Sequence, residues 1–90
     1  MRSRRTARFK RLFEELPAEV QQSAQRAYAL FQRDSAHPGL QFKRSRADRQ
    51  TYSIRIGLGY RALGIRFDET LVWYWIGPHA EYDRLVSQLR

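Results

Sequence analysis

The sequence predicts an α+β fold in which an N-terminal helical hairpin packs on a twisted antiparallel four-stranded sheet, followed by a C-terminal helix. Three observations support it: apolar residues at helical spacing before residue 36, alternating apolar and polar residues from residue 40 onward, and short turn sequences between the alternating segments. A chain of 90 residues with 42% hydrophobic composition builds one core, so we expect a single domain over residues 1–90.

Two helices are predicted in the first third of the chain. Residues 8–16 carry one apolar stripe, formed by Phe9, Leu12, Phe13 and Leu16. Pro17 ends that helix and starts the next, which is expected to run to about Ser35. Residues 1–8 are polar and rich in arginine, and they are predicted to form a basic N-terminal arm.

Four strands are predicted at residues 40–45, 51–57, 60–67 and 71–76. The short connections at residues 57–59 and 68–69 make neighbouring strands antiparallel. The last strand is apolar on both faces, which predicts that other elements pack on each side of it. Gly77 and Pro78 end this strand, and a final helix is expected from about His79 to Leu89.

Composition narrows the classes of function. The 17 Lys and Arg residues against 9 Asp and Glu residues give a net charge of +8, which favours a polyanionic partner. The absence of cysteine excludes disulfides and thiolate metal sites, and two distant histidines favour no metal site, so we expect no metal and no cofactor. No apolar run suits a signal peptide or a membrane span, and a cytoplasmic location is expected.

The basic residues concentrate between residues 40 and 66, where seven Lys and Arg residues accompany one acid, Asp48. Arginine suits bidentate phosphate contacts, so this segment predicts a phosphate-binding surface. The alternative is that these are solvated strand residues that keep the protein soluble. The predicted phosphate-binding residues are Lys43, Arg44, Arg46, Arg49, Arg55 and Arg66.

The same region offers groups for cleaving RNA without a metal. That reaction needs a base for the 2′-hydroxyl proton, an acid for the leaving oxygen and positive charge for the phosphate. His79 supplies an imidazole, the side chain suited to proton transfer at neutral pH; Tyr82 lies three residues on, and Arg61 lies on a strand adjacent to that of Arg55. From spacing alone, a His79 that caps a helix and a Tyr82 that packs in the core remain alternatives.

Three motifs carry a resemblance to a known family. Residues 52–57 read Tyr-Ser-Ile-Arg-Ile-Gly, residues 59–63 read Gly-Tyr-Arg-Ala-Leu, and residues 75–83 read Trp-Ile-Gly-Pro-His-Ala-Glu-Tyr-Asp. Together they resemble the RelE/ParE superfamily of bacterial type II toxins, over roughly residues 9–89. The resemblance implies a toxin that is inhibited by a cognate antitoxin and that cuts messenger RNA on the ribosome, inhibiting translation.

The resemblance also implies residue roles. Arg61 would stabilise the phosphorane, Lys43 and Arg55 would grip phosphate, and His79 would act as general acid or base. Tyr82 would stack on a base or share the proton transfer. Two other functions are compatible with the same fold: a ParE-like inhibitor that binds DNA gyrase without catalysis, and a catalytically inert nucleic-acid-binding relative.

The chain departs from the family pattern at two points. Family members generally open with a strand before the helical hairpin, whereas residues 1–8 are polar and rich in arginine, so we expect that strand to be absent, short, or formed only with a partner. The sheet would then be four-stranded, with an exposed edge for an antitoxin strand. The family's pair of catalytic lysines is reduced here to Lys43 beside Arg44, and Asp48 is the best carboxylate candidate for a base.

Overall fold

The computed structural model describes residues 2–45 and 50–88, so Arg46, Asp48 and Arg49 lie outside the described residues. The predicted helices and strands are confirmed, most with small shifts of their ends, while the strand predicted at residues 40–45 is shortened and one strand is added at the N-terminus. In chain order the elements are β1 (Arg2–Arg5), α1 (Ala7–Glu14), α2 (Ala18–Arg33), the 3-10 helix η1 (Pro38–Leu40), β2 (Lys43–Arg44), β3 (Thr51–Ile56), β4 (Tyr60–Phe67), β5 (Thr70–Pro78) and α3 (His79–Ser87).

The sheet has five strands in the order β1-β5-β4-β3-β2, which corrects the prediction of four. Strand β1 pairs in parallel with β5, from Arg2 opposite Thr70 to Arg5 opposite Trp73, whereas the other pairs are antiparallel. The predicted basic arm is therefore this strand, followed by Thr6 and the start of α1. Its side chains are polar, so backbone pairing rather than an apolar pattern makes it a strand.

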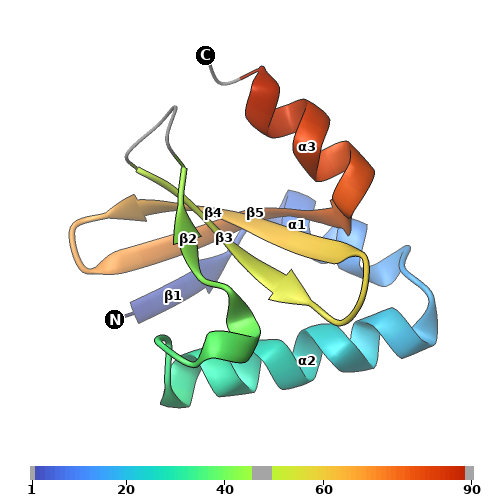
Figure 1. Cartoon of the computed structure of the whole chain (residues 1–90), viewed down its shortest axis with the longest axis horizontal. Coiled ribbons are helices and arrows are strands. Elements are labelled where there is room, and N and C mark those ends of the chain that lie inside the picture. Colours follow the sequence, from blue (N-terminus) through green and yellow to red (C-terminus); the bar gives the residue numbers. More distant parts are fainter. Residues whose placement is uncertain (1, 46–49, 89–90) are drawn as a thin grey trace.

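The helical hairpin covers one face of the sheet, as predicted, and α3 lies over the other (Figure 1). The main core lies between the hairpin and the sheet. There Phe31 of α2 meets Trp73 of β5 edge to face, with ring centroids 5.5 Å apart, and Phe9 is its buried residue from α1. Thr6 caps α1 by accepting a hydrogen bond from the Phe9 amide at 3.0 Å.

The strand predicted at residues 40–45 is shorter in the structure. Pro38, Gly39 and Leu40 form η1, which places the Leu40 side chain in the core at 1% exposure. Gln41 ends η1 in the left-handed region, at φ 47° and ψ 48°. Only Lys43 and Arg44 then pair with β3, at Ser53 and Tyr52 respectively. The turn at Gln41 interrupts the alternation that predicted a longer strand.

Helix α3 follows β5 directly and is attached to the β3–β4 turn. The His79 amide donates to the Gly59 carbonyl at 2.7 Å, which fixes the start of the helix. None of the residues in α3 is buried, whereas Leu63 and Trp75 on the sheet face that it covers are 1% and 4% exposed. In the part of the chain that the structure describes, no helix has the length and apolar character needed to cross a membrane.

Candidate functional site

The predicted site residues of β3 and β4 lie on the sheet face that α3 covers. Arg55 and Arg61 are directly opposite each other in the β3–β4 ladder, and Arg61 is opposite Gly77 of β5. Side chains directly opposite in a ladder share a face, so the two arginines are neighbours, as their positions in the sequence predicted. Ser53 lies two residues before Arg55 and therefore on the same face.

Arg61 is the buried centre of this face, with 3% of its surface exposed. Its Nη2 donates to the main-chain oxygen of Gln41 at 3.0 Å and to the Ser53 hydroxyl at 2.8 Å. Its Nη1 donates to Gln41 Oε1 at 3.3 Å. Its Nε is also buried and has no hydrogen-bond partner among the described residues. The guanidinium is therefore fixed mainly through its two terminal nitrogens.

The surroundings of Arg61 lower the pKa of its guanidinium overall. Burial lowers the pKa of the Arg61 guanidinium, Tyr82 partly offsets this, and the neighbouring charge of Arg55 lowers the pKa further. The Arg61 Cζ lies 5.0 Å from the centroid of the Tyr82 ring, in a cation–π arrangement. An arginine keeps its proton at physiological pH, so the site holds a fixed positive charge under an aromatic ring.

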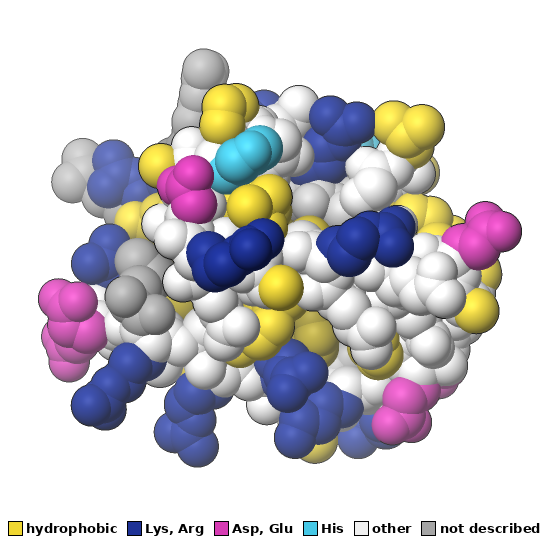
Figure 2. All heavy atoms as spheres, turned by 90° about the horizontal axis from the view of Figure 1, so that it is seen from below, with side chains coloured by type: hydrophobic (Ala, Val, Ile, Leu, Met, Phe, Trp, Pro, Cys, Tyr) yellow, Lys and Arg dark blue, Asp and Glu magenta, His cyan; other side chains and the backbone are white. Residues whose placement is uncertain are grey.

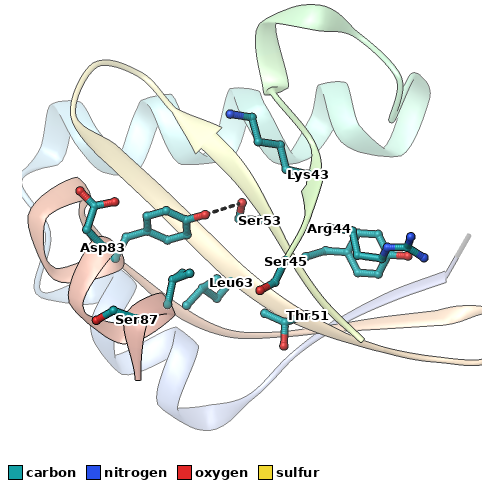
Figure 3. Close-up of a pocket in the computed structure, with 11 residues that line it drawn as sticks. Lys43, Arg44, Ser45, Thr51, Ser53, Leu63, Asp83 and Ser87 are labelled. Carbon is teal, nitrogen blue, oxygen red and sulfur yellow. Dashed lines mark hydrogen bonds between the residues drawn. The ribbon is translucent and has the colours of Figure 1, made fainter. Parts of the chain in front are cut away.

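Ser53 connects Arg61 to Tyr82. The Ser53 and Tyr82 hydroxyl oxygens are 3.2 Å apart and share a hydrogen bond (Figure 3). Because a guanidinium only donates, Ser53 Oγ accepts from Arg61, which leaves the Ser53 proton available for the Tyr82 oxygen. In that arrangement the Tyr82 proton is free to be donated outward. The three side chains thus form a hydrogen-bond chain from the sheet to α3.

His79 and Asp83 lie one turn apart at the start of α3. His79 Nδ1 is 3.2 Å from Asp83 Oδ2, and the two side chains are 54% and 64% exposed. The His79 and Tyr82 rings meet edge to face, with centroids 5.5 Å apart. The structure therefore brings together all three residues predicted to be catalytic, since Arg61, Tyr82 and His79 form one continuous contact series.

A cavity of about 710 Å³ opens beside this series, between α3 and strands β2 and β3 (Figure 3). Leu63 and Val86 give it an apolar part, and Tyr82, Asp83 and Lys43 give it polar groups. Lys43 is opposite Ser53 in the ladder and so shares the face of Arg61. Arg44 also lines the cavity, but its guanidinium points away from Ser53, Asp83 and Ser87 in Figure 3.

The remaining predicted phosphate-binding residues do not all lie at the site. Arg55 is half-buried, and its Nε donates to the Gly57 carbonyl at 3.0 Å, next to the site. Arg66 lies on the opposite face of β4 from Arg61, five residues and roughly 17 Å further along the strand. Its Nε donates to the Asp68 carbonyl. The positions of Arg46 and Arg49 fall outside the described residues.

Basic side chains are not confined to the site face. Figure 2 looks onto the opposite side of the molecule, the side of α2, and lysine and arginine side chains spread across it among single acidic groups. Within residues 2–45 and 50–88, no Lys or Arg side chain lies within ion-pair distance of a carboxylate, and the one histidine–carboxylate contact joins His79 and Asp83. The net charge of +8 acts as a field around the whole molecule.

Sequence reasoning missed three residues of the site: Gln41, Ser53 and Asp83. Neither Gln41 nor Ser53 titrates near neutral pH, and only the β3–β4 register and the turn after η1 place them beside Arg61. The contact of Asp83 with His79 could have been predicted, because the two lie four residues apart in the expected helix and such residues are neighbours. No group of three His, Asp or Glu side chains within the described ranges is arranged to hold a metal ion.

Comparisons with known proteins agree with this geometry. A family model described as the ParE-like toxin domain matches residues 18–84, which include η1, all of β2–β5 and the predicted catalytic residues. The chain belongs to the ParE-like toxin domain family. It is thus a toxin of the RelE/ParE superfamily, as the three sequence motifs indicated. A comparison with curated protein sequences found no match.

Solved structures of toxins share the fold of this ParE-like domain. The RelB-RelE antitoxin-toxin complex from Methanococcus jannaschii matches with a TM-score of 0.71 at 16% identity, covering 89% of this chain and 95% of that chain. YafQ from E. coli strain BL21(DE3) matches with a TM-score of 0.71 at 8% identity, covering 91% and 98%. The isolated E. coli RelE toxin matches with a TM-score of 0.61 at 16% identity, covering 99% and 98%. The RelE-like α+β fold predicted from the sequence is confirmed.

Proposed function

We propose that this toxin is a metal-independent endoribonuclease that cuts messenger RNA on the ribosome and so inhibits translation. One observation carries the proposal: an exposed histidine–carboxylate pair contacts the ring of a tyrosine that lies over a fixed arginine. These are the base, the acid and the positive charge that cleavage by a 2′-hydroxyl requires. The location proposed for this activity is the cytoplasm, where translating ribosomes are found.

His79 is assigned the role of general base. When Nδ1 carries the proton, it donates to Asp83, and Nε2 keeps a free lone pair for the 2′-hydroxyl proton. Asp83 then orients the ring and stabilises the imidazolium that forms, as a carboxylate does behind a catalytic histidine. Both side chains are more than half exposed, so an RNA strand can reach them.

Tyr82 is assigned the role of general acid. Its oxygen accepts from Ser53, which in turn accepts from Arg61, so its own proton is left for the departing 5′-oxygen. The positive charge of Arg61 beneath the ring favours the phenolate that remains after this transfer. Arg61, which is buried, thus supports the reaction from below Tyr82, and Lys43 at the cavity rim is the exposed cation for the phosphate.

A cognate antitoxin is the proposed protein partner. The Methanococcus jannaschii structure is an antitoxin-toxin complex, and so is RelBE2 from Mycobacterium tuberculosis, which matches with a TM-score of 0.59 at 26% identity over 86% of this chain and 95% of that chain. In this chain the sheet ends at β1 and β2, two short strands of four and two residues. The open side of β2 replaces the predicted four-stranded edge as the proposed place for an antitoxin strand.

The test is induced expression in bacteria of the wild-type chain and of His79→Ala, with RNA ends mapped on translating ribosomes. We expect growth arrest and new messenger RNA ends for the wild type and neither for His79→Ala. The matched control is His37→Asn, because Asn retains an acceptor for the Gly39 amide that His37 Nδ1 now binds at 3.0 Å. It should remain fully toxic.

Two results would contradict the proposal. Full toxicity of His79→Ala would remove the proposed base from the reaction. Growth arrest with intact messenger RNA and a DNA-damage response would favour an inhibitor of DNA gyrase that acts by binding.

A further inference from the structure

We propose that Gln41 is a positioning residue of this site, which holds the Arg61 guanidinium beneath Tyr82 through both of its oxygen atoms. The inference rests on the proposed ribonuclease function and adds to it a residue from outside the β3–β5 sheet and α3. Gln41 lies between η1 and β2, 20 residues from Arg61 in the sequence.

The contacts form a two-point clamp. The main-chain oxygen of Gln41 accepts from Arg61 Nη2 at 3.0 Å, and Gln41 Oε1 accepts from Nη1 at 3.3 Å. Two acceptors from one residue thus bind the two ends of a rigid planar fork, which fixes its rotation about the Nε–Cζ bond. Ser53 Oγ is the third acceptor, at 2.8 Å.

The backbone of Gln41 supports a role for its side chain. At φ 47° and ψ 48° the residue is left-handed, a conformation that glycine adopts without strain and that other residues rarely adopt. Glycine would supply the turn and the main-chain oxygen equally well. What glycine lacks is Oε1, the atom that contacts Arg61. A strained residue beside a functional group, held by surrounding contacts, is the pattern expected when its side chain is needed.

The clamp acts on the reaction through Ser53. Arg61 donates to the Ser53 hydroxyl, which shares a hydrogen bond with the Tyr82 hydroxyl at 3.2 Å. If the guanidinium rotates, the Ser53 proton is no longer directed at the Tyr82 oxygen and the proton of Tyr82 loses its orientation. Gln41 itself need not touch RNA, so its loss is expected to lower kcat and leave KM nearly unchanged.

The key variant is Gln41→Gly, which removes Oε1 while it relieves the left-handed strain. The matched control is Asp68→Gly, since Asp68 is the other described non-glycine residue with positive φ, at 54°, and lies in the turn between β4 and β5. Both variants are expected to keep the wild-type melting temperature within a few degrees. For cleavage of a reporter messenger RNA on purified ribosomes, we expect kcat to fall about tenfold for Gln41→Gly, the equivalent of one charged hydrogen bond, and to be unchanged for Asp68→Gly.

A third variant, Gln41→Glu, keeps two acceptor oxygens at the same reach. It should retain kcat, while its negative charge raises KM for RNA. A Gln41→Gly enzyme with wild-type kcat, or a Gln41→Glu enzyme as slow as the glycine variant, would overturn the positioning role.

A measurement independent of activity separates this inference from the proposed function. In spectra of arginine side-chain nitrogens, the clamped Arg61 guanidinium should show separate Nη signals that average in Gln41→Gly and persist in Asp68→Gly. Unchanged Nη signals in Gln41→Gly would refute the clamp. If the wild-type protein does not cut RNA, the ribonuclease proposal and the role of Gln41 in it both fail, and the Nη signals then decide whether the clamp exists.

Discussion

Replacing Gly77 with alanine should lower the free energy of unfolding, by an amount that follows from the contacts around this glycine. Gly77 lies opposite Arg61 in the sheet, and the Trp75 indole lies over it. A Cβ at position 77 would be 2.6 Å from Trp75 Cζ2 and 3.0 Å from Cη2, about 1 Å inside normal carbon–carbon contact. Trp75 is only 4% exposed, so its ring has little room to move away.

The expected cost follows from two opposing effects. Overpacking a buried site costs about 1–3 kcal/mol, and alanine recovers about 0.4–1 kcal/mol by restricting the unfolded chain. The middle of each range gives a net destabilisation of Gly77→Ala of about 1.3 kcal/mol. For a domain of this size that corresponds to a fall in melting temperature of roughly 5–10 °C. Thermal unfolding followed by circular dichroism measures it directly.

The control for this prediction is Gly39→Ala. Its Cβ would be 3.2 Å from the Nδ1 atom of His37, an exposed side chain that can shift. The melting temperature of this variant should stay within about 4 °C of wild type, less than one kcal/mol. If Gly77→Ala is as stable as Gly39→Ala, the Trp75 ring is not fixed over Gly77, and the reasoning is wrong.

Three further predictions concern the site. Arg61→Met removes the fixed charge beneath Tyr82 and the donor to Ser53, so kcat should fall at least as far as in Gln41→Gly in the same assay, and an unchanged kcat would contradict the role of Arg61. Tyr82→Phe keeps the ring over Arg61 and should lower kcat by about 10² with little change in KM, in the assay used for Gln41; an unchanged kcat would remove Tyr82 as the acid. Lys43→Ala should weaken the salt dependence of binding to single-stranded RNA when it is made in the His79→Ala protein, which is expected not to cut the RNA. In fluorescence anisotropy, the slope of log K against log salt should become less negative by about 0.7, the value for one phosphate contact. An unchanged slope would show that Lys43 contacts no phosphate.

Much of the fold was predictable because its apolar residues recur at the spacing typical of a helix or of a strand. The stripe from Phe9 to Leu16 and the alternation from Tyr60 to Phe67 each indicated the observed element, and the glycine-rich turn at residues 57–59 indicated the hairpin. Strand β1 was not predictable in this way. Its residues Arg2–Arg5 have no apolar side chain, and they form a strand because the backbone of β5 is available beside them.

The candidate site was predictable only in part. Arg61, His79 and Tyr82 carry chemistry that a sequence reveals, and the structure places them in contact. Ser53 contacts Arg61 because of the strand register, and Gln41 contacts it because of a left-handed turn. Neither the register nor the turn can be read from composition or residue spacing. The alternation over residues 60–67 did place Arg66 on the opposite face from Arg61, and β4 confirms it.

The division of the site between α3 and the sheet has a consequence for local stability. Arg61 and Ser53 are buried in the sheet, whereas His79, Tyr82 and Asp83 stand on a helix without a single buried residue. Amides of α3 should therefore exchange with solvent through local opening, at a free energy well below that of global unfolding. Detaching this one helix would separate the proposed proton-transfer groups from the arginine and leave the core between the hairpin and the sheet intact. The proposed activity is thus expected to be lost before the domain unfolds.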